Sequence, residues 1–83
     1  MYNTIITKPA RKNLSRLSNA EYLRIRAKLK LLADDPRPRG CKKIESQKDR
    51  FRIRTGDFRV LYSINDEKKE VIIYRIAHRK ESY

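Results

Sequence analysis

The spacing of apolar residues changes once along the chain, from helical periodicity to strict alternation. Residues 2–7 (YNTIIT) are rich in β-branched and aromatic side chains, a composition typical of a strand. Pro9 favours the first turn of a helix, and apolar residues then recur at helical spacing as far as Leu32. After residue 50, apolar and polar side chains alternate in three further segments. The pattern therefore predicts one strand, two helices and three more strands, in that order.

Two local signals divide the helical region into a hairpin. The first helix should be capped by Thr7 or Lys8, and its apolar stripe comprises Ala10, Leu14 and Leu17. Ser18 and Glu21 match the S-x-x-E capping box, so a second helix should begin at Ser18. The buried stripe of this second helix is expected to comprise Tyr22, Ile25, Leu29 and Leu32. The helix should end before Pro36, because the residue preceding a proline avoids the helical conformation.

The alternating segments predict which side chains share a face. Phe51 and Ile53 should face the helices, which places Arg52 and Arg54 on the other face. After a tight turn at residues 55–57 (TGD), the strand at 58–64 places Arg59 and Leu61 opposite an apolar face of Phe58, Val60, Tyr62 and Ile64. In the last strand, 71–77, one face should hold Arg75, Ala77 and, if the strand continues, Arg79. A further short strand is expected around residues 43–45.

These elements predict an α+β fold with the order β-α-α-β-β-β. A helical hairpin should pack on one face of a small, mainly antiparallel, twisted sheet. The chain has 83 residues and contains neither a repeat nor an internal linker, so we expect a single domain spanning residues 1–83. Hydrophobic residues make up 39% of the chain, which is enough for one sheet and one layer of helices.

Composition excludes several classes of function. No apolar run approaches the ~18 residues of a membrane span, and the first residues lack the apolar segment of a signal peptide. The single cysteine, Cys41, cannot form an internal disulfide and fits a reducing cytoplasm. Two glycines make no phosphate-binding loop, and one histidine with one cysteine makes no zinc site of the usual spacing. We therefore expect a cytoplasmic protein without a metal or a cofactor.

The charge balance points to a polyanionic partner. Lys and Arg number 22 against 10 Asp and Glu, giving a net charge of +12. Such charge on a small domain is most often directed at nucleic acid, although an acidic protein would satisfy the same field. Between residues 37 and 59 the basic positions are 37, 39, 42, 43, 48, 50, 52, 54 and 59. Only Glu45, Asp49 and Asp57 provide acidic groups in that segment.

Strand arginines on the face away from the helices have the chemistry of a phosphate clamp. Arg52, Arg54 and Arg59 should share that face, together with Arg75 or Arg79 from the last strand. Their planar guanidinium groups can bind phosphate oxygens two at a time, and the basic loop adds Lys42 and Lys43. The simpler interpretation is that the arginines form only the solvent-exposed side of the sheet.

Three segments together resemble the RelE/ParE superfamily of bacterial toxins, and its RelE-type mRNA interferases most closely. They are LADDPRPRGCKKI at the end of the helical hairpin, FRIRTGDFRVLYSI in the central hairpin, and IAHRKESY, which is similar to the family's H-R-x-x-x-Y. The resemblance spans nearly the whole chain. It implies the predicted β-α-α-β-β-β fold, an acidic antitoxin partner in a hetero-oligomer, and cleavage of mRNA in the A site of the 70S ribosome, with contacts to rRNA.

The resemblance also assigns roles to individual residues. Arg59 matches the arginine that grips the scissile phosphate, and Arg79 matches a basic residue that serves as acid or phosphate ligand. Tyr83 matches an aromatic residue that stacks on or orients the nucleotide. His78 matches a position at which some relatives have a histidine acid.

One departure from the family affects the proton acceptor. Arg52 and Arg54 match positions where the family often has lysine, one of which is proposed as a general base. Arginine keeps its proton at any physiological pH, so both residues should act as electrostatic clamps. The candidates left for the acceptor are Tyr83, His78 and Glu81.

Three functions follow from these observations. The first is a metal-independent endoribonuclease toxin that inhibits translation. The second is a ParE-like toxin that binds and poisons DNA gyrase without enzymatic activity, although such relatives usually lack the full basic set and the final tyrosine. The third is an RNA-binding module without toxicity.

Overall fold

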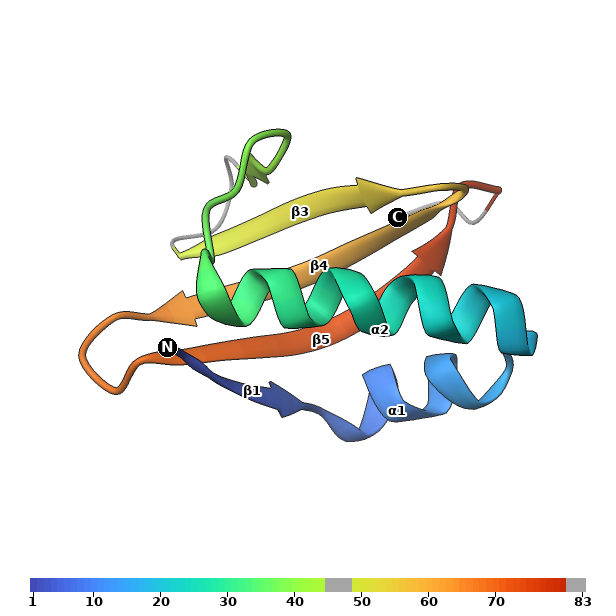
Figure 1. The fold of residues 1–83 in the computed structure, drawn as a ribbon, viewed down its shortest axis with the longest axis horizontal. Coiled ribbons are helices and arrows are strands. Elements are labelled where there is room, and N and C mark those ends of the chain that lie inside the picture. The colour runs from blue at the N-terminus through green and yellow to red at the C-terminus, as the bar shows by residue number, and fades with distance from the viewer. Residues whose placement is uncertain (45–48, 81–83) are drawn as a thin grey trace.

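The computed structural model describes residues 1–44 and 49–80 and has two helices on one face of a five-stranded sheet (Figure 1). Its elements are β1 (Asn3–Ile6), α1 (Lys8–Ser15), α2 (Asn19–Asp34), β2 (Lys42–Lys43), β3 (Arg50–Thr55), β4 (Phe58–Asn65) and β5 (Glu70–His78). The strand order is β1-β5-β4-β3-β2, in which β1 runs parallel to β5 and the other neighbours are antiparallel. The predicted α+β fold is confirmed. The short strand expected around residues 43–45 corresponds to β2 at residues 42–43, and residue 45 lies outside the described residues.

Side-chain caps set the starts of both helices. The Thr7 hydroxyl accepts a hydrogen bond from the backbone N–H of Ala10 (3.4 Å), with Pro9 in the first turn of α1. Ser18 and Glu21 form the complete capping box of α2, with hydrogen bonds of 3.2 and 3.0 Å. An N-cap of this kind typically contributes ~1 kcal/mol to helix stability. These local signals act within four residues, so they could be predicted from the sequence.

The core lies between α2 and the sheet. The helix lies over one face of the sheet (Figure 1). Ile25, Leu29 and Leu32 supply the buried face of α2, as predicted. The sheet contributes Ile53, Val60, Tyr62, Ile64, Val71, Ile73 and Ile76. Each such side chain contributes ~1.5–3 kcal/mol by leaving water, and together they hold the sheet in place as a platform for the opposite face.

Tyr22 is not part of the core, so the prediction of a fourth buried residue in α2 was wrong. Its side chain is 38% exposed. It lies in the first turn of α2, where the helix runs beside α1, and it lines a groove with Leu14 and Leu17. Helical periodicity places Tyr22 on the correct side of α2, but the sheet does not extend beneath that turn.

A β-bulge between β4 and β5 changes the alternation of the last strand. Tyr62 pairs with Ile73, but the next residue on β4, Leu61, pairs with Arg75. Tyr74 is therefore an extra residue on β5, and the faces of all later residues are reversed relative to a regular strand. Arg75 and Ala77 consequently lie away from the helices with Arg59, as expected from the sequence, whereas Ile76 packs into the core.

Candidate nucleic-acid interface

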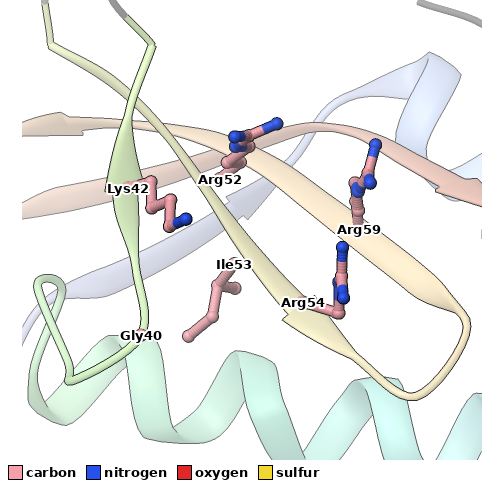
Figure 2. Close-up of a pocket in the computed structure, with 6 residues that line it drawn as sticks. All are labelled: Gly40, Lys42, Arg52, Ile53, Arg54 and Arg59. Atoms are coloured by element: carbon pink, nitrogen blue, oxygen red, sulfur yellow. The ribbon is translucent and has the colours of Figure 1, made fainter. Parts of the chain in front are cut away.

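The face of the sheet that no helix covers, hereafter the open face, contains a cleft lined mainly by basic side chains (Figure 2). The cleft encloses about 280 Å³ and is lined by Gly40, Lys42, Arg52, Ile53, Arg54 and Arg59. In Figure 2 the side chains of Arg52, Arg54 and Arg59 point to the open face, whereas that of Ile53 points towards the helices. We call the four basic residues, Lys42, Arg52, Arg54 and Arg59, the arginine cleft.

A two-residue turn brings the two central arginines together. β3 ends at Thr55 and β4 begins at Phe58, which pairs with it, so the turn consists of Gly56 and Asp57. Gly56 adopts a φ of 59°, a conformation that costs glycine little and that two-residue hairpins require. The resulting register places Arg54 directly opposite Arg59. Cβ atoms of such pairs lie ~5 Å apart, and two like charges at that distance form a strong site for an anion.

The edge strand β2 adds one of the two predicted lysines to the cleft. Lys42 pairs with Arg52 and therefore shares the open face, whereas Lys43 pairs with Phe51 and belongs to the opposite face. Phe51 stacks against the buried Tyr62, with ring centroids 5.9 Å apart. Because paired residues on neighbouring strands point to the same side, Lys43 is separated from the arginines by the sheet itself.

A buried tyrosine anchors the loop that leads to β2. Tyr62 donates a hydrogen bond from its hydroxyl to the carbonyl oxygen of Pro36 (2.7 Å). Burial raises the pKa of this hydroxyl well above its usual value, so the side chain stays a neutral donor at physiological pH. The loop from Pro36 to Cys41 is thereby held against the core before it reaches Lys42.

Arg79 reaches the same end of the sheet as Arg54 and Arg59. Its backbone N–H donates to the carbonyl oxygen of Asp57 in the β3–β4 turn (2.7 Å). Its side-chain Nε lies 3.7 Å from Oδ1 of Asp57, and both side chains are exposed. The turn therefore positions Arg79 near the arginine cleft without enclosing it.

His78 does not join the arginines. It pairs with Phe58, and their rings meet edge to face with centroids 5.1 Å apart, on the helix side of the sheet. Its Nδ1 accepts a hydrogen bond from the backbone N–H of Lys80 (3.2 Å). Strand alternation could have predicted this position, because His78 follows Ala77 and must therefore point to the face opposite the open face. The two remaining candidates, Tyr83 and Glu81, lie outside the described residues.

The structure adds two residues that the sequence prediction left out of the site. Arg50 shares the open face with Arg52 and Arg54, and its Cζ lies 4.3 Å from the centroid of the Tyr74 ring. Alternation along β3 could have identified Arg50. Only the contact across the sheet shows the surroundings of Tyr74.

The chemistry available on the open face is anion binding by fixed guanidinium groups. In the part of the chain that the structure describes, no group of three His, Cys, Asp or Glu side chains is arranged to hold a metal ion. No helix among the described residues is long and apolar enough to span a membrane. The arginines on neighbouring strands suit a phosphate group bound by several guanidinium groups at once.

Comparisons with known proteins agree with this geometry. A family model described as the ParE toxin of type II toxin–antitoxin system, parDE, matches residues 4–83. Comparison with curated protein sequences gave no significant match.

Several solved structures are similar over nearly their whole length. A chain of the archaeal RelE–RelB complex from Pyrococcus horikoshii OT3 is 32% identical with a TM-score of 0.85, over 98% of each chain. A chain of the RelBE2 toxin–antitoxin complex from Mycobacterium tuberculosis is 30% identical with a TM-score of 0.82, over 94% of this chain and 98% of the other. The isolated Escherichia coli RelE toxin shares the fold, with a TM-score of 0.85 at 21% identity over 99% and 88% of the chains.

Proposed function

The chain belongs to the RelE/ParE superfamily of type II toxin–antitoxin toxins, and we propose that it is a ribosome-dependent endoribonuclease that cleaves mRNA in the A site. The observation that carries this proposal is the arginine cleft, in which Arg54 and Arg59 are cross-strand partners beside Arg52. A phosphate placed there meets several planar donors on a rigid sheet. Such an arrangement suits a reaction whose main difficulty is the charge that develops on phosphorus and its oxygens.

The reaction uses the RNA's own nucleophile. The ribose 2′-oxygen forms a bond to the adjacent phosphorus as the bond from phosphorus to the 5′-oxygen of the next nucleotide breaks. The products are a 2′,3′-cyclic phosphate and a 5′-hydroxyl. The proton of the 2′-hydroxyl passes to a base, and the departing 5′-oxygen takes up a proton. This route calls for no hydrolytic water, because the attacking group is already part of the substrate. In the proposed mechanism the basic side chains, rather than a metal ion, offset the developing charge.

The described residues would act mainly by binding and stabilising charge. Arg59 binds the scissile phosphate, while Arg52, Arg54 and Lys42 offset the negative charge of the pentacoordinate state. Arg79, which contacts Asp57 in the neighbouring turn, would approach the same phosphate. Lys43 projects from the other face and is better suited to contact with ribosomal RNA.

Proton transfer falls to the residues that follow β5. Tyr83 is proposed to stack on or orient the nucleotide and to take part in proton transfer, with Glu81 as a further acceptor. His78 would have to leave its contact with Phe58 to reach a phosphate on the open face. Guanidinium groups cannot accept the proton, because they stay charged.

An acidic antitoxin is the proposed protein partner. The related chains from P. horikoshii and M. tuberculosis occur in toxin–antitoxin complexes. A net charge of +12 would steer an acidic segment towards the open face, so the association rate should fall as salt is added. Covering the arginine cleft would block access of the phosphate. This regulation would take place in the cytoplasm, where the ribosomes are.

A ParE-like gyrase poison is the second candidate, because the family model that matches the chain carries that name. The two candidates separate in one experiment with the purified toxin. Ribosomes programmed with mRNA should yield fragments cut within the A-site codon and ending in a cyclic phosphate, while supercoiling by DNA gyrase continues normally. Intact mRNA together with inhibited gyrase would replace the ribonuclease proposal with the gyrase one.

A further inference from the structure

One aromatic side chain lies on the open face beside the arginine cleft. Tyr74 is half-buried there, in the middle of β5. In residues 1–44 and 49–80, the other aromatic side chains lie elsewhere. Tyr2, Phe51, Phe58 and Tyr62 belong to the core or pack against it, and Tyr22 lies on α2. Core packing therefore does not account for the position of Tyr74.

The β-bulge explains how Tyr74 comes to lie there with a basic neighbour. Ser63 pairs with Ile72 and Leu61 pairs with Arg75, so Tyr74 is the inserted residue between these two open-face pairs. A bulge leaves its extra residue without a ladder partner and re-aims its side chain. In this sheet Tyr74 has no partner in the β4–β5 ladder, and its ring instead meets a side chain from β3.

Arg50 reaches across β4 to meet the ring of Tyr74. Its Cζ lies 4.3 Å from the ring centroid, well within the range of a cation–π contact. Arg50 is paired with Ser63, whose small side chain leaves space for the guanidinium group to cross the strand. The two planar groups are therefore already assembled on the surface of the sheet.

The Arg50–Tyr74 pair continues the chemistry of the arginine cleft. Arg50 is two residues from Arg52 along β3, a separation of about 7 Å. Proteins that bind single-stranded RNA combine cations for the phosphates with aromatic rings or arginine planes on which bases stack. The open face offers both kinds of group side by side. The alternative is that the pair only shields the backbone of β4.

We propose that Arg50 and Tyr74 form a second contact site for single-stranded RNA, in which a nucleobase stacks on the pair while a neighbouring phosphate lies in the arginine cleft. This inference rests on the proposed ribonuclease function, because that function identifies the ligand as RNA. It predicts a contribution to RNA binding that is separate from cleavage, because neither residue touches the scissile phosphate in this arrangement.

The test measures RNA binding directly. The probe is a fluorescent single-stranded RNA of about ten nucleotides, made uncleavable by 2′-O-methyl groups. Tyr74→Leu should weaken binding about five-fold or more, whereas Tyr74→Phe should bind nearly as well as wild type. Arg50→Lys keeps the positive charge but removes the planar guanidinium group, so this substitution should also weaken RNA binding. Tyr22→Leu is the matched control on the helix side of the molecule and should bind like wild type.

Abasic probes identify stacking as the cause. Removing the base at one position should weaken binding to wild type but cause no further loss with Tyr74→Leu. If Tyr74→Leu melts at a lower temperature, Arg50→Lys carries the test, since it keeps the charge and the aliphatic stem of this half-buried residue and removes only the planar guanidinium group. Unchanged affinity in the folded variants would overturn the proposal, as would loss of antitoxin binding with unchanged RNA binding. If wild type fails to cleave mRNA on ribosomes while these variants still lose RNA affinity, the ribonuclease function fails and the contact site stands.

Discussion

Arg54 and Arg59 face each other across the β3–β4 hairpin, so that two guanidinium groups lie side by side on the open face of the sheet. Like charges in directly opposite positions oppose strand pairing. The sheet can hold them because a two-residue turn and a buried core on the other face determine the register. An anionic ligand bound by both groups would offset this repulsion, as the proposed phosphate site requires.

Arg59 is expected to be the most sensitive single position for activity. Arg59→Ala should reduce A-site cleavage about 100-fold, equivalent to ~3 kcal/mol of transition-state stabilisation, because a charge-assisted contact to the reacting phosphate is lost. Cleavage on programmed ribosomes measures the effect, and circular dichroism checks that the variant is folded. Arg16→Ala, an exposed arginine at the end of α1, should cleave normally. Full activity in a folded Arg59→Ala protein would contradict the ribonuclease mechanism.

Binding of an anion to the Arg54–Arg59 pair should stabilise the folded protein even in the absence of RNA. Inorganic phosphate should raise the melting temperature of wild type more than that of Arg54→Gln, because a ligand that binds only the folded state stabilises it. Chloride at equal ionic strength controls for screening, and Arg16→Gln controls for the loss of one charge. Equal phosphate shifts in all three proteins would mean that the pair is not an anion site.

Tyr62 should be important for stability through its hydroxyl as well as its ring. Tyr62→Phe removes the hydrogen bond to the buried carbonyl of Pro36, which should cost about 1–3 kcal/mol. For a domain of this size, each 1 kcal/mol lowers the melting temperature by about 4–8 °C. Thermal unfolding measures the change. The same substitution at the exposed Tyr22 should have no effect, and an unchanged melting temperature in Tyr62→Phe would show that the loop is held by other contacts.

Asp66 should link stability to acid pH. Arg37 and Tyr2 donate hydrogen bonds to its carboxylate, and the pKa of Asp66 is lowered from its ordinary value of 3.8. The ionised carboxylate therefore stabilises the folded state at pH values above 3.8. This contribution decreases as the pH falls below 3.8, and it is absent below the lowered pKa of the folded state. Both partners of the ion pair are about half exposed, so the effect should be small. The melting temperatures of wild type and Asp66→Asn should differ at pH 7 and converge at pH values below the lowered pKa. A constant difference at all pH values would exclude this linkage.

The pH profile of cleavage should identify the residue that transfers the proton. If Tyr83 acts as acid or base, Tyr83→Phe should change the slope or midpoint of the profile and not only its height. His78→Gln should leave the profile unchanged, because in the wild type the His78 ring packs on Phe58, on the face of the sheet away from the arginines. If neither substitution alters the profile, catalysis here depends on positioning and charge stabilisation rather than on acid–base chemistry.

The sequence by itself determined the helix starts and the two faces of β3 and β4. The Thr7 cap and the Ser18 capping box act over three residues, so no distant contact is needed to form them. Successive strand residues point to opposite faces whatever strand lies beside them. Alternation therefore placed Arg52, Arg54 and Arg59 on one face before any pairing was known.

Only the tertiary structure decided which of those residues meet. The pairing of Arg54 with Arg59, the attachment of Arg79 to Asp57 and the division of Lys42 from Lys43 depend on strand register, which is a relation between distant segments. The bulge at Tyr74 reversed the faces of the last residues of β5, and the end of the sheet beneath α2 left Tyr22 exposed. A local sequence pattern predicts the face of the strand or helix on which a side chain lies. The residue that it contacts on that face depends on how the strands and helices pack together.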